Sequence, residues 1–460
     1  MERVISRYNV RVRRLAPVLI VVAIGLWSRD AAAEKVVDIR VDGNTKTTDD
    51  TVRLIAGIEK GDELTPERVE QVRRDLVTSG LFKDIQVYWE PAPGGQRLVI
   101  IARDKHSWVI APAAYNQPTN KGVGAGFGEN NLFGENKKLL LYGQVATGDS
   151  FLVAAYVDPS IAGTRLRWQG DLFLKYGRVI EYASPTKYWR DDPRPLRISR
   201  LTYLNGGLRL GTHLWKGVTL DGRLRGAKVG YSKLEIAEGA TLEEITGDPA
   251  ATTIPTPGAE GWDVSGEVSL GVDTRANWYG ISSGYRFVAS FEHALPGLGS
   301  DFEYWYGGVN LQRAIRFLER HNLVLRGSFG YGQDMPFQQE YVAGGTSQRG
   351  WKNNQFRGDL RVTANAEYSV PIVTIKGLAV RGLTFWDSSY ITFKNADDTA
   401  GVRDYLPGAD ARGLAPLRNS VGVGTRLYLR QIVLPLLGLD FGYGVERGDY
   451  EIYLAIGLTD

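Results

Sequence analysis

The sequence contains no cysteine, and its 460 residues include four histidines and two methionines. Without cysteine the chain has no disulfide, no thiolate metal site and no cysteine nucleophile. Four histidines leave little material for a metal cluster, so we expect no cofactor. The formal net charge of +3 at pH 7 is close to neutral and does not favour nucleic acid as a partner.

Apolar stretches long enough to cross a membrane as a helix are also missing. The N-terminal stretch Leu15–Trp27 has 13 residues, whereas a spanning helix needs about 20. It follows a run of arginines and precedes three alanines that end at Ala33, which is the order of a secretory signal peptide. We therefore expect residues 1–33 to be an export signal that is cleaved after Ala33. A membrane location of the mature chain would then require a β-barrel.

The sequence is rich in glycine and aromatic residues, with 55 Gly, 15 Phe, 11 Trp and 23 Tyr. Together with a mean hydropathy of -0.22, they are typical of a sheet-rich chain with aromatic girdles. From residue 105 onward apolar and polar residues alternate with period two, as where Leu166 and Trp168 oppose Arg167 and Gln169. A soluble β-sandwich alternates in the same way, so the number and length of the strands decide between these folds.

Sixteen strands can be traced in residues 105–460, and the segments that divide them differ in length. Short turns such as Phe133–Glu135 alternate with long polar stretches such as Lys233–Gly261, which is the habit of outer-membrane barrels. An even number of strands lets the first and last pair antiparallel and leaves no open edge. We therefore predict an all-β membrane barrel of 16 antiparallel strands. The predicted strands begin near Ser107, Gly122, Lys138, Phe151, Arg165, Arg200, Val218, Trp262, Gly284, Glu303, Asn322, Asp359, Leu378, Asn419, Leu437 and Tyr450.

Residues 34–104 carry a different pattern, that of a small α+β domain with the order β-α-α-β-β. The first strand lies in Lys35–Val41, and Thr65 is a helix N-cap followed by Pro66 at the first helical position. Gly80 supplies the left-handed end of this helix. The phrases "VDGNTKTTDDTVR", "KGDELTPERVEQVRRDL" and "SGLFKDIQV" resemble a POTRA domain. The resemblance implies that the domain docks substrate strands or accessory proteins by edge-strand addition.

Three phrases in the barrel region resemble the superfamily that includes BamA, TamA and the secretion transporter FhaC. The phrases "GVGAGFGENNLFGENKKL" and "AAYVDPSIAG" are similar to its opening strands, and "YVAGGTSQRGWKNNQFRGD" is similar to its sixth extracellular loop. The signature of that loop is Arg-Gly-aromatic, here Arg349, Gly350 and Trp351, with Gln348 where valine is commonest. The resemblance implies a protein that inserts or translocates polypeptides at the outer membrane of a Gram-negative bacterium.

In that superfamily the loop folds back into the barrel, and its arginine meets acidic groups on the inner wall. Two positions here match those groups: Glu367 in "NAEYSVP", and Asp387 in "FWDSS", where Ser389 replaces the last glycine of the family pattern. A guanidinium in the lumen would form charge-assisted bonds with both carboxylates, whereas a lone loop arginine is usually solvated. The resemblance therefore implies a loop lock with a structural and gating role, made of Arg349, Gly350, Trp351, Glu367 and Asp387.

The resemblance also implies that the first and last strands pair poorly and form a seam that opens to template an incoming strand. Here the seam would lie between Ser107–Ala114 and Glu451–Leu458, and Pro112 removes one ladder donor from it. The implied partners are outer-membrane lipids, unfolded outer-membrane or secreted polypeptides, and periplasmic accessory proteins. Two features depart from the assembly members: a single POTRA domain, and a C-terminus, Leu-Thr-Asp, without an aromatic residue.

Functions of other classes remain as alternatives: a passive porin-like channel or a structural outer-membrane protein, and a hydrolase. A passive porin would need neither the small domain nor an inward-folded loop. A hydrolase would need a serine, a histidine and an acid on neighbouring strands, and none of His106, His213, His293 and His321 has a serine nearby in a recognisable context. We therefore expect no enzymatic activity.

Overall fold

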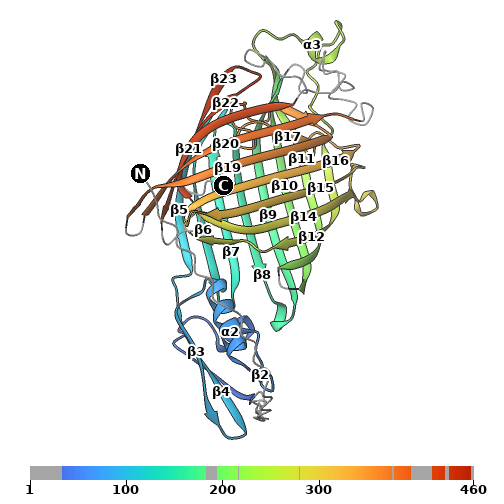
Figure 1. The fold of residues 1–460 in the computed structure, drawn as a ribbon. Helices are drawn as coiled ribbons and strands as arrows, with labels where there is room; N and C mark the ends of the chain where they lie inside the picture. Colours follow the sequence, from blue (N-terminus) through green and yellow to red (C-terminus); the bar gives the residue numbers. More distant parts are fainter. Residues whose placement is uncertain are drawn as a thin grey trace, which may run out of the picture.

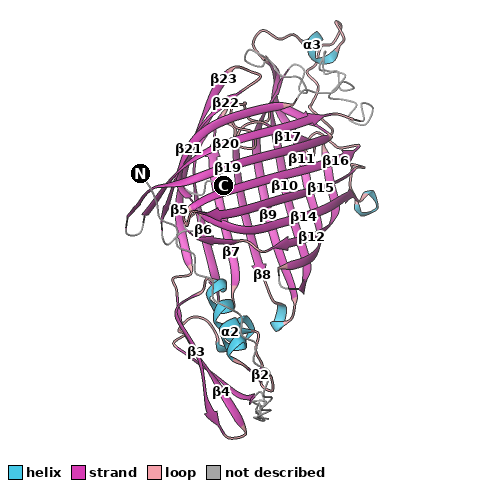
Figure 2. Ribbon diagram, viewed as in Figure 1, coloured by secondary structure: helices cyan, strands magenta, loops and turns pink. Residues whose placement is uncertain are grey.

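The computed structural model shows a small four-stranded domain followed by a closed β-barrel (Figure 1). The helices belong to the small domain and to connections between barrel strands (Figure 2). The expected signal peptide, residues 1–33, lies outside the described part of the chain. The structure describes residues 34–182, 194–215, 217–278, 280–375, 378–394, 417–429 and 435–456.

The small domain places two helices against one face of a sheet with the order β2-β1-β4-β3. Val52 and Leu76 of the helices and Leu98 and Ile100 of the sheet are almost completely buried and form its core. The predicted order lacked β2, because an element of two residues shows no periodic pattern. The elements are β1 (Glu34–Asp42), α1 (Asp49–Ala56), β2 (Glu63–Leu64), α2 (Pro66–Ser79), β3 (Phe82–Ala92) and β4 (Gly95–Asp104).

The boundaries of α2 follow from its capping residues. The Thr65 side chain accepts a hydrogen bond from the backbone amide of Arg68, and Pro66 is the first helical residue. The helix ends at Gly80, whose φ of 73° lies in the left-handed region. Both ends agree with the sequence prediction.

The remaining strands close into a sixteen-stranded antiparallel barrel, in which β13 (Ala276–Trp278) is a short extension of the β12–β14 hairpin. The prediction of the fold is confirmed, and each strand begins within three residues of its predicted start, except β10, which begins earlier, at Pro195. The barrel strands are β5 (Trp108–Gln117), β6 (Asn120–Leu132), β7 (Lys137–Ala146), β8 (Asp149–Asp158), β9 (Leu166–Tyr182), β10 (Pro195–Trp215), β11 (Val218–Ile236), β12 (Gly261–Asp273), β14 (Ile281–Ala294), β15 (Trp305–Phe317), β16 (His321–Gln333), β19 (Leu360–Ile375), β20 (Leu378–Thr392), β21 (Arg418–Leu429), β22 (Pro435–Gly444) and β23 (Asp449–Ile456).

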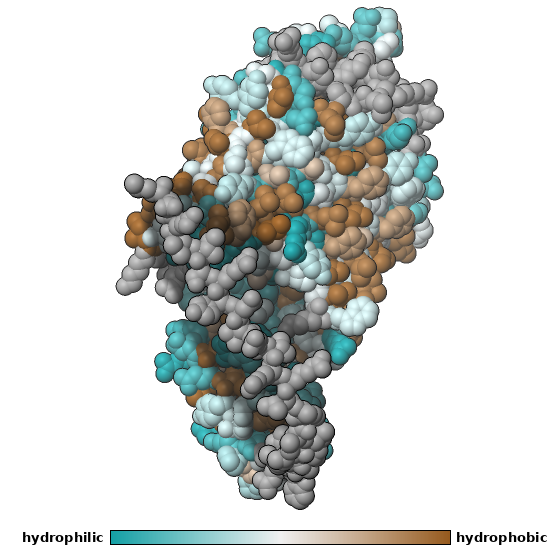
Figure 3. Space-filling model, viewed as in Figure 1, coloured by the Kyte–Doolittle hydropathy of each residue, from teal (hydrophilic) through white to brown (hydrophobic). Residues whose placement is uncertain are grey.

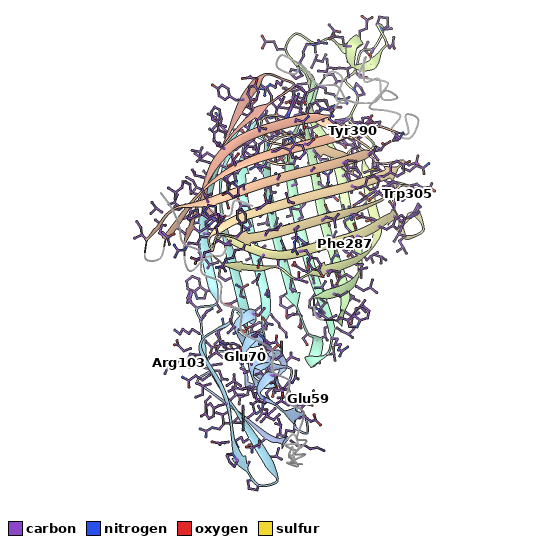
Figure 4. All side chains as sticks on the ribbon, in the orientation of Figure 1. Glu59, Glu70, Arg103, Phe287, Trp305 and Tyr390 are labelled. Carbon is purple, nitrogen blue, oxygen red and sulfur yellow. The ribbon has the colours of Figure 1, made fainter. Side chains whose placement is uncertain are left out.

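The barrel wall is apolar outside and charged inside, the reverse of a soluble protein. Leu166 and Leu172 of β9 face outward and are 52% and 41% exposed, and apolar side chains cover much of the visible wall (Figure 3). Trp305, on the wall in Figure 4, stacks against the outward-facing Phe291 with ring centroids 5.8 Å apart. Between these outward positions of β9, Arg167 faces the lumen and pairs with the carboxylate of an inward-facing neighbour. Such a wall suits hydrocarbon outside and water inside. None of the described helices is long and apolar enough to span a bilayer.

The small domain lies at the barrel end that carries the short turns (Figure 1). Its loop between β1 and α1 contacts the end of β6 and the turn that follows: Lys46 pairs with Glu129 of β6 at 2.8 Å, and the Thr48 amide donates to the Gly134 carbonyl at 3.0 Å. At the end of β4, the Asp104 carboxylate accepts from the Lys46 amide at 2.7 Å. The domain is therefore held by side-chain and backbone contacts as well as by the covalent linker.

Candidate functional site

The segment between β16 and β19, residues 334–359, folds into the barrel, and we call it the inward loop. Its two arms pair as the short strands β17 (Tyr341–Ala343) and β18 (Phe356–Gly358). The backbone amide of Gly345 donates to the Trp351 carbonyl at 3.0 Å and closes the tip. The tip is buried although it belongs to a connection, and Arg349 is 6% exposed. A buried loop must satisfy its polar groups with partners on the wall.

Arg349 meets three carboxylates that reach it from different strands. Its Nε and Nη2 donate to the two oxygens of Asp387 on β20, each at 2.9 Å, in a bidentate pair. Its Nη1 lies 3.3 Å from a Glu367 oxygen on β19 and 3.3 Å from an Asp440 oxygen on β22. The guanidinium also lies over the Phe385 ring, 3.4 Å from its centroid. The structure thus brings together the arginine and both acids that the sequence had singled out.

Asp440 was missed by the sequence analysis. It also binds Arg426 of β21, with Nη2 and a carboxylate oxygen 2.7 Å apart, so it links the loop arginine to a wall arginine. The signal was present, since Leu439 and Phe441 on either side are apolar and face outward, which turns Asp440 inward by the alternation of a strand. Alternation alone does not say which inward acids stand near the loop.

Gly350 and Trp351 seat the tip against β22 and β23. Gly350 has a φ of +92°, and a Cβ atom at this position would lie 2.6 Å from the backbone nitrogen of Gly444. The Gly350 amide donates to the Tyr453 hydroxyl at 3.0 Å. Trp351 is fully buried and packs edge-on against Phe356, with ring centroids 5.1 Å apart. A side chain at 350 would therefore prevent this close approach of loop and wall.

The first and last barrel strands, β5 and β23, meet and close the barrel. Among the described residues they pair at Leu454 with Asn116, at Ala455 with Tyr115 and at Ile456 with Ala114. The neighbouring β22 and β23 pair along the whole of β23. Pro112, further along β5, has no backbone N–H to donate to a ladder. We call this junction the seam.

The inward loop contacts both sides of the seam from within the lumen. On the β23 side, Tyr453 donates its hydroxyl to the Trp351 carbonyl at 2.8 Å. On the β5 side, Asn353 donates its side-chain amide to the Gln117 side-chain oxygen at 2.6 Å. Lys352 lies 3.6 Å from Glu451 of β23. No sequence motif pointed to these contacts, because they depend on where the folded loop ends up.

The arms of the inward loop are held on the opposite wall. Gln339 donates to Asp263 of β12 at 2.9 Å. Asp263 belongs to a buried cluster centred on Arg225 of β11, which also pairs with Glu292 of β14 at 2.7 Å. Within the arms, Arg357 pairs with a loop glutamate and lies 3.5 Å over the ring of Phe337. The loop is therefore tied to two walls rather than to one.

The described residues contain no group of three or more His, Asp or Glu placed to hold a metal ion. Of the four histidines, His321 contacts the Tyr368 hydroxyl at 2.7 Å, and His293 contacts the adjacent backbone carbonyl of Ala294. These are local contacts of strand residues.

The fold and loop define a membrane β-barrel with one N-terminal POTRA-type domain. A family model described as Omp85 superfamily domain matches residues 131–459, and a POTRA model described as surface antigen variable number repeat matches residues 34–101. The chain therefore belongs to the Omp85 superfamily, and the resemblance seen in the sequence is confirmed.

Solved structures of similar fold include a BamA and two CdiB proteins. BamA from Haemophilus ducreyi lacking POTRA domains 1–3 is 17% identical, with a TM-score of 0.61, covering 92% of this chain and 84% of that one. CdiB from Acinetobacter baumannii is 13% identical, with a TM-score of 0.60 and coverage of 93% and 74%. CdiB from Escherichia coli is 12% identical, with a TM-score of 0.61 and coverage of 92% and 76%. No curated protein matches the sequence.

Proposed function

We propose that this protein inserts or translocates polypeptides at the outer membrane, with its small domain in the periplasm. Membership of the Omp85 superfamily supports this class of function. The small domain lies at the end of the barrel with the short turns, which is the periplasmic end in outer-membrane barrels. In this proposal residues 1–33 direct export, residues 34–104 form the POTRA domain and residues 105–460 form the barrel.

The observation that carries the proposal is the seam, where the first and last strands meet and the inward loop contacts both of them. Opening it breaks the ladder hydrogen bonds between β5 and β23 and the loop contacts that span them. An opened seam exposes the unpaired edges of β5 and β23, and an exposed edge is a template for another strand. An incoming polypeptide would add to one edge as a strand, with no covalent step and no nucleotide.

The inward loop would control this opening. Its tip reaches Tyr453 on one side of the seam and Gln117 on the other, so it resists separation of the two strands while it is seated. Arg349, buried against Glu367, Asp387 and Asp440, keeps it seated, because withdrawing the arginine would leave Asp387 and Glu367 without this counter-charge, whereas Asp440 would keep Arg426. We propose the loop lock as a gate and not as a catalytic site.

Depletion of the protein followed by outer-membrane proteomics tests the function. Broad loss of barrel proteins would indicate assembly, and loss of one secreted protein would indicate dedicated export. An unchanged outer-membrane and secreted proteome would contradict the proposal. The passive-porin alternative predicts a wide, steady conductance that Arg349→Ala leaves unaffected, which planar-bilayer recording would detect.

The small domain would dock periplasmic segments or accessory proteins through its sheet edges. The strand β3 lies at one edge of the sheet order β2-β1-β4-β3, so its outer side is open to strand addition. Tyr88 and Trp89 on this strand are 44% and 43% exposed, which offers aromatic contacts beside the edge. Loss of co-purified periplasmic proteins on placing proline in the middle of β3 would test this docking.

A further inference from the structure

The barrel wall is low over β5–β8 at the end opposite the small domain. Residues 118–119 connect β5 to β6 there, and residues 147–148 connect β7 to β8. The next strand, β9, continues to Tyr182, beyond Gly177, which is its last residue paired with β8. In this extension the described residues pair β9 with β10 alone. We call residues 178–181 of this extension the β9 edge.

The backbone of the β9 edge is directed at the space above the β7–β8 turn. The amide of Arg178 donates to the Gly148 carbonyl at 2.9 Å, so its N–H points toward the β8 side. Backbone groups alternate in direction along a strand of an antiparallel pair. The N–H and C=O of Ile180 therefore point the same way as those of Arg178, where no described strand lies beside them. An edge of this kind is a template for another strand.

A polar pocket of about 160 Å³ lies between the β9 edge and the inward loop. Val179 and Ile180 of the edge line it together with Gln338, Asn353 and Asn354 of the loop. Both polar atoms of the Gln338 side chain are buried, and neither has a hydrogen-bond partner in the part of the chain that the structure describes. The same is true of the Asn353 side-chain oxygen. Buried polar groups normally have partners, so the pocket offers an unmatched donor and unmatched acceptors to an occupant.

The charged side chains of the pocket are largely matched with one another. Lys175 lies 3.2 Å from a carboxylate oxygen of Asp149. Arg357 pairs with Glu340 at 2.8 Å. Arg178 donates to a backbone carbonyl of the β5–β6 turn at 2.5 Å, and a guanidinium has five donors. The pocket therefore does not select a strongly charged occupant, but it keeps donors for carbonyl oxygens.

We propose that an extended polypeptide segment binds here as an additional strand on the β9 edge, above the β7–β8 turn and against the inward loop. A polypeptide carries a donor and an acceptor at nearly every residue, which matches both the strand edge and the side-chain amide of Gln338. Main-chain hydrogen bonds would supply affinity for many sequences, and the pocket would favour polar side chains. The inference rests on the proposed handling of polypeptides and adds a second strand-binding site, which β5–β8 separate from the seam.

The test is binding of a fluorescent peptide to the purified full chain in neutral detergent, measured by fluorescence anisotropy. The peptide has alternating serine and valine and is about six residues long, a common strand length. Ile180→Pro removes a donor from the β9 edge and no β9–β10 hydrogen bond. We expect it to weaken binding about fivefold, which corresponds to about 1 kcal/mol. Ile180→Ala, the matched control, keeps the donor and should bind as the wild type does. Equal affinities of the two variants would overturn the proposal.

Two further arms use the wild-type protein and so do not depend on how a variant folds. The same peptide methylated on every backbone nitrogen cannot donate to the edge and should bind about tenfold more weakly. If it binds as well as the unmodified peptide, the site is not a strand-binding edge. Maltoheptaose in excess should leave the bound peptide in place. Displacement would mean that the pocket recognises the hydroxyl groups of a carbohydrate, and the assignment to a polypeptide would be wrong.

A disulfide across the seam separates this site from the seam itself. In the variant Ala114→Cys/Ile456→Cys, oxidation should leave peptide binding unchanged. Loss of binding on oxidation would place the peptide at the seam and overturn the proposal. Peptide binding combined with unchanged proteomes after depletion would contradict the proposed function and leave the β9 site standing. Altered proteomes without peptide binding would support the function and overturn the site.

Discussion

The side-chain amide of Asn353, in the inward loop, donates to the side-chain oxygen of Gln117 at 2.6 Å and so joins the loop to the first strand of the barrel. Three residues before Asn353, the amide of Gly350 binds the hydroxyl of Tyr453 on the last strand. The loop therefore spans the seam between β5 and β23 from inside. The position of the loop therefore affects how easily β5 and β23 separate.

Replacing Asn353 with alanine should weaken the seam without unfolding the barrel. A single neutral hydrogen bond contributes about 1 kcal/mol, so a modest fall in the temperature at which the folded band disappears on heated gels is expected. Asn116→Ala is the matched control, because Asn116 stands on β5 within the seam but its side chain forms no hydrogen bond with a described loop residue. Equal effects of the two variants would show that the loop contact does not matter.

Replacing Arg349 with alanine should have the larger effect. Removing one partner from a buried ionic cluster costs about 3–5 kcal/mol, since Asp387, Glu367 and Asp440 would remain without their shared cation. We expect a lower folding yield and a lower melting temperature on heat-modifiability gels. Arg349→Lys retains the charge but not the planar guanidinium, so its melting temperature should lie between those of the alanine variant and the wild type. Unchanged melting of the alanine variant would rule out the lock.

Gly350→Ala should unseat the tip through sterics alone. The added Cβ would meet the backbone nitrogen of Gly444 at 2.6 Å, in addition to the strain of a positive φ. Gly163→Ala is an informative control, because Gly163 has a φ of +78° but nothing within 4 Å of the added atom. If both variants lose the same stability, the loss is due to backbone strain, and the close packing of loop on wall is not needed.

The attachment of the small domain should depend on pH through Asp104. Burial alone would raise the pKa of Asp104, but hydrogen bonds from the Thr47 hydroxyl and from the amides of Lys46 and Thr45 outweigh it and lower the pKa. A carboxyl whose folded pKa is depressed contributes stability above its unfolded pKa of about 3.9 and loses it as pH falls through the lower folded value.

Limited proteolysis across pH measures this attachment. Protection of the residues that link β4 to β5 should be constant near neutral pH and should fall below about pH 4. Asp104→Asn should be less protected at neutral pH and should lose the steepest part of the pH dependence. An identical profile for the variant would mean that another group controls the attachment.

Much of this fold could be predicted because barrel strands repeat one simple pattern. The alternation around Leu166 and the caps Thr65 and Gly80 are local features, and the structure agrees with them. Glu367 and Asp387 could be named because they stand in recognisable phrases. Asp440, Gln117 and Arg225 could not, because their roles depend on strand register and on the final position of a loop that is distant in sequence. The start of β10 differed because this strand continues beyond the short β7–β8 hairpin, where polar residues such as Arg197 are buried under loops.

The most direct test of the central claim is a reversible closure of the seam. Ala114 and Ile456 stand opposite each other across it, and the chain has no other cysteine, so Ala114→Cys/Ile456→Cys can form one disulfide there. The control pair is Val123→Cys/Val145→Cys, which joins β6 to β7 at an equivalent outward position. In cells depleted of the native protein, we predict that the variant with the oxidised seam pair fails to restore the outer-membrane proteome. Adding reductant to the same variant should restore the proteome. The variant with the control pair should restore the proteome whether its cysteines are oxidised or reduced. Full restoration by the oxidised seam pair would contradict a mechanism in which the seam opens.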